Sequence, residues 1–177
     1  LQLQHKGEVD MLEETYLKII SAKTAELFAA STKVGAILSD MKNKEKEALE
    51  FYGRNLGLTF QIADDTLDYN SELKLFGKKI GQDFYEGKVT LPIILLFQKA
   101  NKEEKDKLKE IFSKKVRSES ELVYTLSLIK KYNVIKGCYQ KAEHYINLAS
   151  NSLSLFNDCE EKSILENLTS FSLARNF

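Results

Sequence analysis

The chain has 177 residues with 26 Lys and Arg against 26 Asp and Glu, so its formal net charge is zero. This length suits one domain with a substantial hydrophobic core, and we expect residues 1–177 to form a single domain. The charge balance argues against a nucleic-acid-binding protein, because such a surface usually carries a strong basic excess.

The composition indicates an almost all-helical chain, since it has one proline, eight glycines and much Leu, Lys, Glu, Ser and Ala. Apolar residues at helical spacing predict helices over residues 13–39 and 44–69. Residues 70–88 carry three of the glycines without a clean period, which predicts a long loop of the kind that is often functional. A charged helix or hairpin is predicted over residues 101–115, and further helices are predicted over residues 90–100, 118–132, 134–156 and 159–174.

The sequence gives little support for a membrane-spanning protein or for a protein held together by disulfides. The longest apolar run, residues 91–97, is well short of the roughly 18 residues of a membrane span, and no signal segment opens the sequence. Cys138 and Cys159 lack CxxC or metal-ligand spacing, which is typical of helix cysteines in a reducing compartment. We therefore predict a cytoplasmic protein with no integral membrane segment.

An acidic row lies within the stretch FQIADDTLDY, residues 60–69. Gln61, Asp64, Asp65 and Asp68 follow the i, i+3, i+4, i+7 spacing of one helix face. Carboxylates this close repel one another, so a bound cation would explain the arrangement, and oxygen ligands favour Mg²⁺ shared with substrate phosphates. Taken alone, a DDxxD pattern is more often a solvated acidic face. The aligned glutamine and the glycine- and lysine-rich segment that follows favour a metal site.

Lysines near this row are suited to bind an anion. Lys23 points along a largely apolar helix face with Thr24 beside it, and Lys78, Lys79 and Lys88 lie in the segment after the aspartates. Each lysine alone is more often a solvated or snorkelling side chain. Together with the acidic row they match what a diphosphate–Mg²⁺ complex requires. Gly53 and Gly57, a GxxxG pair, predict close helix packing.

These residues together resemble the C-terminal part of a trans-type polyprenyl diphosphate synthase. The resemblance rests on the following segments: GRNLGLTFQIADDTLDY resembles the family's second aspartate-rich motif, SAKTAELF its lysine-threonine segment, FGKKIGQDFYEGKVTLPIILLF its glycine-lysine loop and following helix, and LTSFSLARNF its final helix. EGKVTLP and SAKTAELF are most similar to the bacterial long-chain branch, such as octaprenyl diphosphate synthases. The likeness covers essentially the whole chain.

The resemblance implies an all-α helical bundle of the isoprenoid synthase type, here lacking its N-terminal helices. It implies a prenyltransferase of isoprenoid biosynthesis that condenses an allylic diphosphate with isopentenyl diphosphate, with Mg²⁺ drawing the allylic diphosphate away. The residues carried over are Asp64, Asp65 and Asp68 for Mg²⁺, Lys23, Lys78 and Lys88 for the allylic diphosphate, and Lys23, Thr24 and Gln61 near the reacting carbons. Because GKKIG has an extra residue, the choice between Lys78 and Lys79 stays open.

The family has a first aspartate-rich motif on a facing helix, and this sequence contains none. We therefore expect the chain alone to be inactive or nearly so, and to act as a homo- or hetero-oligomer. Two alternatives remain open: a non-catalytic subunit of a heteromeric prenyl synthase, and a helical interaction protein with a solvated acidic face. A non-catalytic subunit would have eroded motifs, whereas these motifs are intact. An interaction protein would gain no stability from Mg²⁺ and pyrophosphate.

Overall fold

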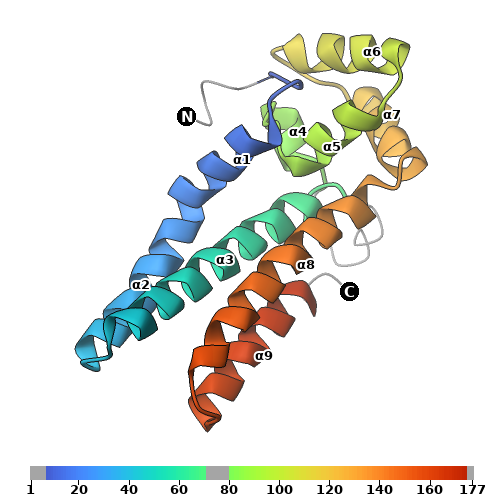
Figure 1. Ribbon diagram of the computed structural model, residues 1–177. Helices are drawn as coiled ribbons and strands as arrows, with labels where there is room; N and C mark the ends of the chain where they lie inside the picture. The colour runs from blue at the N-terminus through green and yellow to red at the C-terminus, as the bar shows by residue number, and fades with distance from the viewer. Residues whose placement is uncertain (1–6, 71–79, 175–177) are drawn as a thin grey trace. The chain divides into compact units, whose positions relative to one another are not determined.

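The computed structural model describes residues 7–70 and 80–174, and regular structure within these ranges is entirely helical (Figure 1). The all-α prediction is thereby confirmed. The helices are α1 (Glu13–Ile20), the π-helical segment η1 (Ser21–Ala25), α2 (Glu26–Leu38), α3 (Asn43–Leu67), α4 (Gln82–Glu86), α5 (Leu91–Lys99), α6 (Lys102–Ser113), α7 (Glu119–Lys131), α8 (Val134–Ser152), the 3-10 turn η3 (Leu153–Leu155) and α9 (Glu160–Ala174). None of the described helices is both long enough and apolar enough to cross a membrane.

The chain divides into two compact units, and each is described here by itself. The first unit comprises residues 1–19 and 64–138, and the second comprises residues 20–63 and 139–177. The prediction that residues 1–177 form one domain stays a prediction.

The second unit is built around the middle of α3. Tyr52 and Leu56 of α3 are buried with Ala36 of α2, Ala149 of α8 and Leu153 in one hydrophobic cluster. The Tyr52 hydroxyl donates a hydrogen bond to the carbonyl of Leu165 in α9, at 2.8 Å. A buried tyrosine needs such a partner for its polar tip, so this bond fixes how α9 meets α3.

Two glycines let α3 approach the preceding helical segments closely. A Cβ atom at Gly53 would lie 2.5 Å from the carbonyl oxygen of Phe28, and one at Gly57 would lie 2.6 Å from the Cα atom of Ala25. Real Cβ contacts are longer than this, so the observed spacing of these helices requires glycine at both positions. The close packing predicted from the GxxxG spacing is confirmed.

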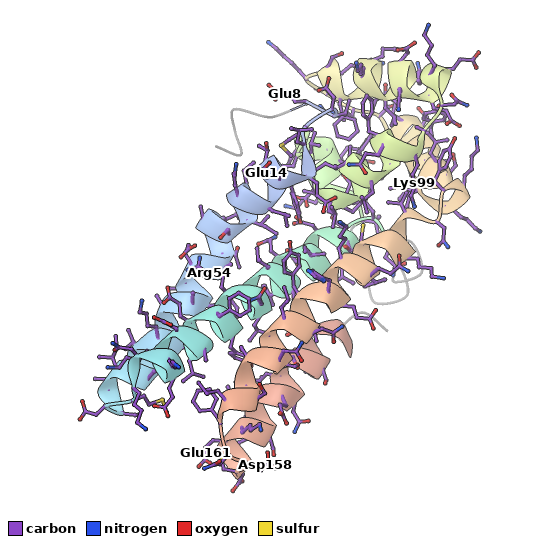
Figure 2. The ribbon with its side chains drawn as sticks, viewed as in Figure 1. Glu8, Glu14, Arg54, Lys99, Asp158 and Glu161 are labelled. Carbon is purple, nitrogen blue, oxygen red and sulfur yellow. The ribbon has the colours of Figure 1, made fainter. Side chains whose placement is uncertain are left out.

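Charged side chains secure the outer side of the same helix pair. Arg54 of α3, labelled in Figure 2, forms ion pairs with Glu26 of α2 and with Glu50 one turn earlier on α3. Lys33 of α2 also pairs with Glu50, at 2.7 Å. These pairs are partly exposed, and ion pairs near the surface contribute little stability individually, so the glycine contacts set the helix spacing and the ion pairs supplement it.

The first unit contains α5, a short apolar helix with Pro92 in its first turn. Residues from Leu91 to Leu96 are all buried, as expected for a helix that is hydrophobic on every side. Pro92 occupies the first turn, where its missing N–H costs no helical hydrogen bond.

Helices α6 and α7 both begin with a capping box. The Asn101 side chain accepts from the amide of Glu104 while the Glu104 carboxylate accepts from the amide of Asn101, and Ser118 and Glu121 repeat this exchange at α7. For the charged segment 101–115, the structure therefore selects a helix over a hairpin.

Two features differ from the predicted elements. The helix predicted over residues 13–39 is interrupted by the π-helical turn of η1, and the loop predicted over residues 70–88 contains the short helix α4. Apolar spacing does not reveal a single widened turn. Helix α4 is five residues long and lies between Gly81 and Gly87, both with positive φ, so it is too short to show a period.

Candidate functional site

Lys23 and Thr24 lie on the π-helical turn. The amide of Glu26 bonds to the carbonyl of Ser21, five residues earlier, so this turn holds one residue more than an α-helical turn. Such turns are rare in proteins overall, and those that occur are often found at functional sites. Lys23 is exposed and Thr24 is half-buried.

Thr24 and Gln61, two predicted site residues from separate helical segments of the second unit, are in direct contact. The Thr24 hydroxyl donates a hydrogen bond to Oε1 of Gln61 at 2.8 Å. Gln61 is 6% exposed. The close approach of Gly57 to Ala25 brings the two segments near enough for this bond, because Thr24 precedes Ala25 and Gln61 follows Gly57 by one turn.

Removing this hydroxyl gives a first prediction. Thr24→Val preserves the side-chain shape and helix tendency but deletes the donor to Gln61, so we expect the free energy of unfolding to fall by about 1 kcal/mol. Chemical denaturation measures the change. Thr24→Ser retains the hydroxyl and should lose less, and equal losses in the two variants would contradict a role for the hydrogen bond.

The aspartates of the first unit occupy unequal environments. Asp64 is exposed, whereas Asp65 is 5% exposed and accepts a hydrogen bond from the Tyr16 hydroxyl at 2.8 Å. Burial raises the pKa of Tyr16 well above its usual value, and the adjacent Asp65 charge raises it further, so the hydroxyl remains a donor. Tyr16 thereby ties α1 to the end of α3.

Asp68 contacts the start of α4. Helix α3 ends at Leu67 rather than at Tyr69 as predicted, so Asp68 lies in the turn that follows the helix. Its carboxylate accepts from the backbone amides of Gln82 at 3.0 Å and Asp83 at 2.9 Å. Asp68 therefore fixes the start of α4 against the end of α3.

Lys88 follows α4 and is held by two carboxylates. Its ammonium lies 3.0 Å from Oδ1 of Asp83 and 2.7 Å from Oε2 of Glu86. Burial alone would lower the pKa of Lys88, but the hydrogen bonds to Glu86 and Asp83 outweigh it and raise the pKa. Lys88 therefore keeps its positive charge through the neutral range.

A continuous series of contacts joins the acidic row to this lysine. Asp68 binds the amide of Asp83, and the Asp83 side chain binds Lys88. Asp83 and Tyr16 were not among the residues predicted from sequence. Tyr16 had a weak signal, a polar tip among apolar helix positions, whereas the role of Asp83 depends on the fold of α4. Lys78 and Lys79 lie outside the described residues.

The described residues contain no group of three or more His, Cys, Asp or Glu side chains positioned together to hold a metal ion. Asp65 and Asp68 each have a carboxylate that accepts hydrogen bonds from donors of the protein. Asp64 is the exposed carboxylate of the three.

Comparison with known proteins identifies the family. The model of the Polyprenyl synthetase family matches residues 1–129. A short chain isoprenyl diphosphate synthase of Methanothermobacter thermautotrophicus is 31% identical over 175 residues, which cover 99% of this chain and 53% of that protein. The chain belongs to the polyprenyl synthetase family.

Solved structures agree with this assignment. A decaprenyl diphosphate synthase from Rhodobacter capsulatus superimposes with a TM-score of 0.93 and 31% identity, over 99% of this chain and 54% of that one. A polyprenyl synthase from Caulobacter crescentus CB15, complexed with calcium and isoprenyl diphosphate, gives a TM-score of 0.91 and 34% identity, over 99% and 54%. The chain thus spans about half the length of the relatives it matches.

Proposed function

We propose that this chain carries the second aspartate-rich part of a polyprenyl diphosphate synthase, a prenyltransferase that condenses an allylic diphosphate with isopentenyl diphosphate. The observation that carries the proposal is the series of contacts from Asp68 through Asp83 to Lys88. These contacts connect the row of carboxylates, which attracts a cation, to Lys88, whose side chain stays positively charged. A diphosphate bound with a divalent cation needs both kinds of group.

The residues present fit Mg²⁺. This ion commonly takes one or two carboxylates and completes its coordination with water and substrate phosphates. Asp64 is exposed and offers an oxygen ligand, and the carboxylates of Asp65 and Asp68 follow it in the sequence and accept hydrogen bonds from the protein. When bound, Mg²⁺ supplies positive charge that stabilises a departing diphosphate. The Caulobacter relative is complexed with calcium and isoprenyl diphosphate, which supports a divalent cation and a ligand of this class.

The other predicted residues take separate roles in the proposal. Lys23 and Lys88 bind diphosphate oxygens as point charges, and Lys78 is proposed for the same role. The hydrogen bond from Thr24 orients the Gln61 amide, so that both face the reacting carbons in one arrangement. An apolar cavity of the complete enzyme would shelter the allylic cation.

The complete activity is proposed for a protein of the relatives' length. Because the chain spans about half of those proteins, we propose that turnover needs the equivalent of their remaining half, within the same chain or in a homo- or hetero-oligomer. The relatives include a short-chain and a decaprenyl synthase, so the proposal concerns the reaction and not a product length. A cytoplasmic location stays a prediction.

Thermal unfolding with Mg²⁺ and inorganic pyrophosphate tests the proposal on this chain. At about 100 times the dissociation constant, binding should stabilise the folded state by about 2.7 kcal/mol, a rise of about 5–10 °C in Tm. Asp64→Asn should lose most of the Mg²⁺-dependent part of this rise. Glu47→Gln, which removes an exposed carboxylate from the same helix, is the matched control and should behave as the parent chain.

An unchanged Tm with Mg²⁺ and pyrophosphate together would overturn the proposed function and favour a helical interaction protein. Equal rises in the Asp64→Asn and parent chains would overturn the assignment of Asp64 to the cation.

A further inference from the structure

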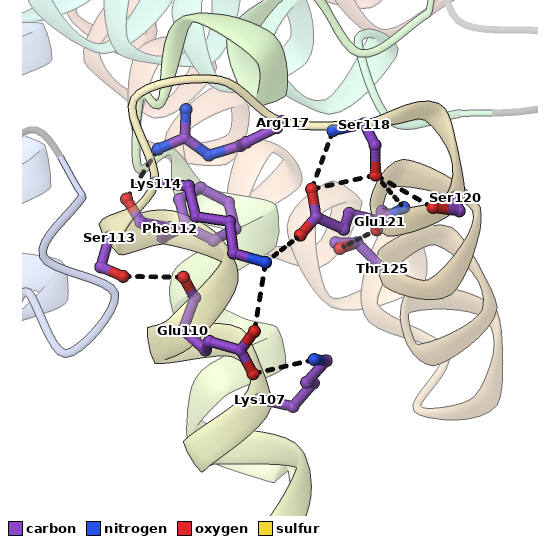
Figure 3. Close-up of polar contacts among 10 residues, drawn as sticks. All are labelled: Lys107, Glu110, Phe112, Ser113, Lys114, Arg117, Ser118, Ser120, Glu121 and Thr125. Carbon is purple, nitrogen blue, oxygen red and sulfur yellow. Dashed lines mark hydrogen bonds and ion pairs between the residues drawn. The ribbon is translucent and has the colours of Figure 1, made fainter.

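Arg117 is a buried arginine in the connection between α6 and α7. Its side chain is 6% exposed. Nη2 donates to the carbonyl oxygen of Phe112 at 2.6 Å, and the guanidinium lies 5.2 Å from the centre of the Phe112 ring (Figure 3). Nη1 donates to the carbonyl oxygen of Tyr85 at 3.4 Å. No carboxylate among the described residues forms an ion pair with it. A buried charge without an ion-pair partner is costly, so the groups in contact with the guanidinium indicate its role.

The carbonyls that it binds belong to two helix ends. Tyr85 lies near the C-terminal end of α4 and Phe112 in the last turn of α6. The final carbonyls of a helix lack amide partners and carry partial negative charge, so a cation is favourable there. One guanidinium thus satisfies acceptors at the ends of both helices.

The same guanidinium lies against the turn that precedes Lys88. Gly87 has φ +73°, and a Cβ atom there would lie 2.6 Å from Nη2 and 2.8 Å from Nη1 of Arg117. The backbone of Gly87 and the guanidinium are therefore in contact. Beyond this turn, the Lys88 amide donates to the carbonyl of Asp83 at 2.9 Å, and its ammonium pairs with Asp83 and Glu86.

We propose that Arg117 is a positioning residue for Lys88: it braces the Gly87 turn from within the first unit and so fixes where the Lys88 ammonium is offered to a diphosphate. The inference rests on the proposed binding role of Lys88. The planar guanidinium suits the task because it presents several donors in a fixed plane, while the lysine ammonium is a single flexible point charge. The α6–α7 connection therefore acts on diphosphate binding without contacting the ligand.

A double-mutant cycle with Mg²⁺ and inorganic pyrophosphate tests this inference by calorimetric titration. Lys88→Met should weaken pyrophosphate binding about tenfold, and Arg117→Met should weaken it several-fold. Because Arg117 acts through Lys88, the double variant should lose no more affinity for pyrophosphate than Lys88→Met alone loses. Lys115→Met, which removes an exposed positive charge two residues away, should leave the affinity unchanged.

A measurement without ligand separates this inference from the proposed function. Amide hydrogen exchange at Gly87 and Lys88 should accelerate in Arg117→Met and stay at the parent rate in Lys115→Met. If Arg117→Met fails to fold, Arg117→Lys makes the same test, because it keeps the charge but cannot span both carbonyls as a guanidinium does. It too should speed exchange and weaken binding.

Different outcomes would contradict the positioning role of Arg117 and the binding role of Lys88. Unchanged exchange in the Arg117 variants, or additive losses of affinity in the double variant, would overturn the positioning role while leaving Lys88 as a binding residue. Parent-like affinity in Lys88→Met would overturn the binding role of Lys88 and, with it, the positioning role built on that residue.

Discussion

Replacing Gly57 by alanine is expected to lower the free energy of unfolding by about 1–3 kcal/mol, although alanine favours helix over glycine by about 1 kcal/mol. The new Cβ atom would lie 2.6 Å from Ala25 Cα and 3.2 Å from Phe28 Cβ. The nearest atom belongs to the backbone, so a change of rotamer cannot relieve the contact. The two helical segments would have to move apart, which loosens a close-packed interior.

Gly35→Ala is the matched control for this substitution. Gly35 lies in the interior of α2, and a Cβ atom there would meet nothing within 4 Å. This variant should be unchanged or more stable by up to about 1 kcal/mol, since only the helix tendency of the residue changes. Chemical denaturation of both variants gives the comparison. Equal stabilities would contradict the close approach at Gly57.

The Gly57 substitution should also reach the candidate site. If it separates the π-helical turn from α3, the hydrogen bond between Thr24 and Gln61 is weakened before any site residue is altered. Adding Thr24→Val to Gly57→Ala should then cost less than Thr24→Val costs in the parent chain. An undiminished cost would show that the turn holds its place without Gly57.

Alkaline pH is expected to lower the free energy of unfolding, because some buried groups have a higher pKa in the folded chain than in the unfolded chain. Burial raises the pKa of Cys138 from 9.0 to about 12, a rise that a hydrogen bond with Thr66 partly offsets. Burial likewise raises the pKa of Tyr52 from 10.0 to about 12. Both side chains are 0% exposed, so the charged forms would lack water in the folded state.

The direction of the effect follows from proton binding. Between pH 9 and 12 the unfolded chain loses the Cys138 proton while the folded chain keeps it, so the folded state binds more protons. The free energy of unfolding therefore falls as pH rises, by about 1.4 kcal/mol per pH unit for each such group. Tyr52 adds to the slope above pH 10, its ordinary pKa. Stability from these groups is fully present below pH 9.

Denaturation curves measured at several pH values between 8 and 11 check this expectation. Cys138→Ala should reduce the slope between pH 9 and 10, because a loss of packing lowers the whole curve whereas the slope falls only when a titrating group is removed. Leu128→Ala, which truncates a buried side chain that does not titrate, should lower stability and retain the parent slope. An identical slope in the Cys138→Ala and parent chains would contradict the assignment.

Much of this fold follows from local patterns that a sequence displays directly. Apolar spacing predicts α3 to within two residues at each end, and Pro92 marks the first turn of α5 as expected. The GxxxG pair indicates the close helix contact because two glycines one turn apart leave no side chain to hold a neighbouring helix away. In each of these cases, neighbouring residues along the chain determine the outcome.

What sequence reasoning missed depends on contacts between distant residues. The aspartates at positions 64, 65 and 68 look alike in sequence, yet Tyr16 binds one and the start of α4 binds another. The π-helical turn adds one residue to a helix without changing its composition. Arg117 gave no signal, because its partners are backbone carbonyls, which every sequence supplies.

The hydrogen bonds of Asp68 have a consequence for how this protein can vary. Its carbonyl and carboxylate accept from the amides of Gly81, Gln82 and Asp83, so the two ends of the intervening stretch are fastened to each other. A substitution at Asp68 would release the start of α4 and, through the contact of Asp83 with Lys88, change the surroundings of that lysine as well. Variation at this one position therefore affects two features that lie far apart in the sequence.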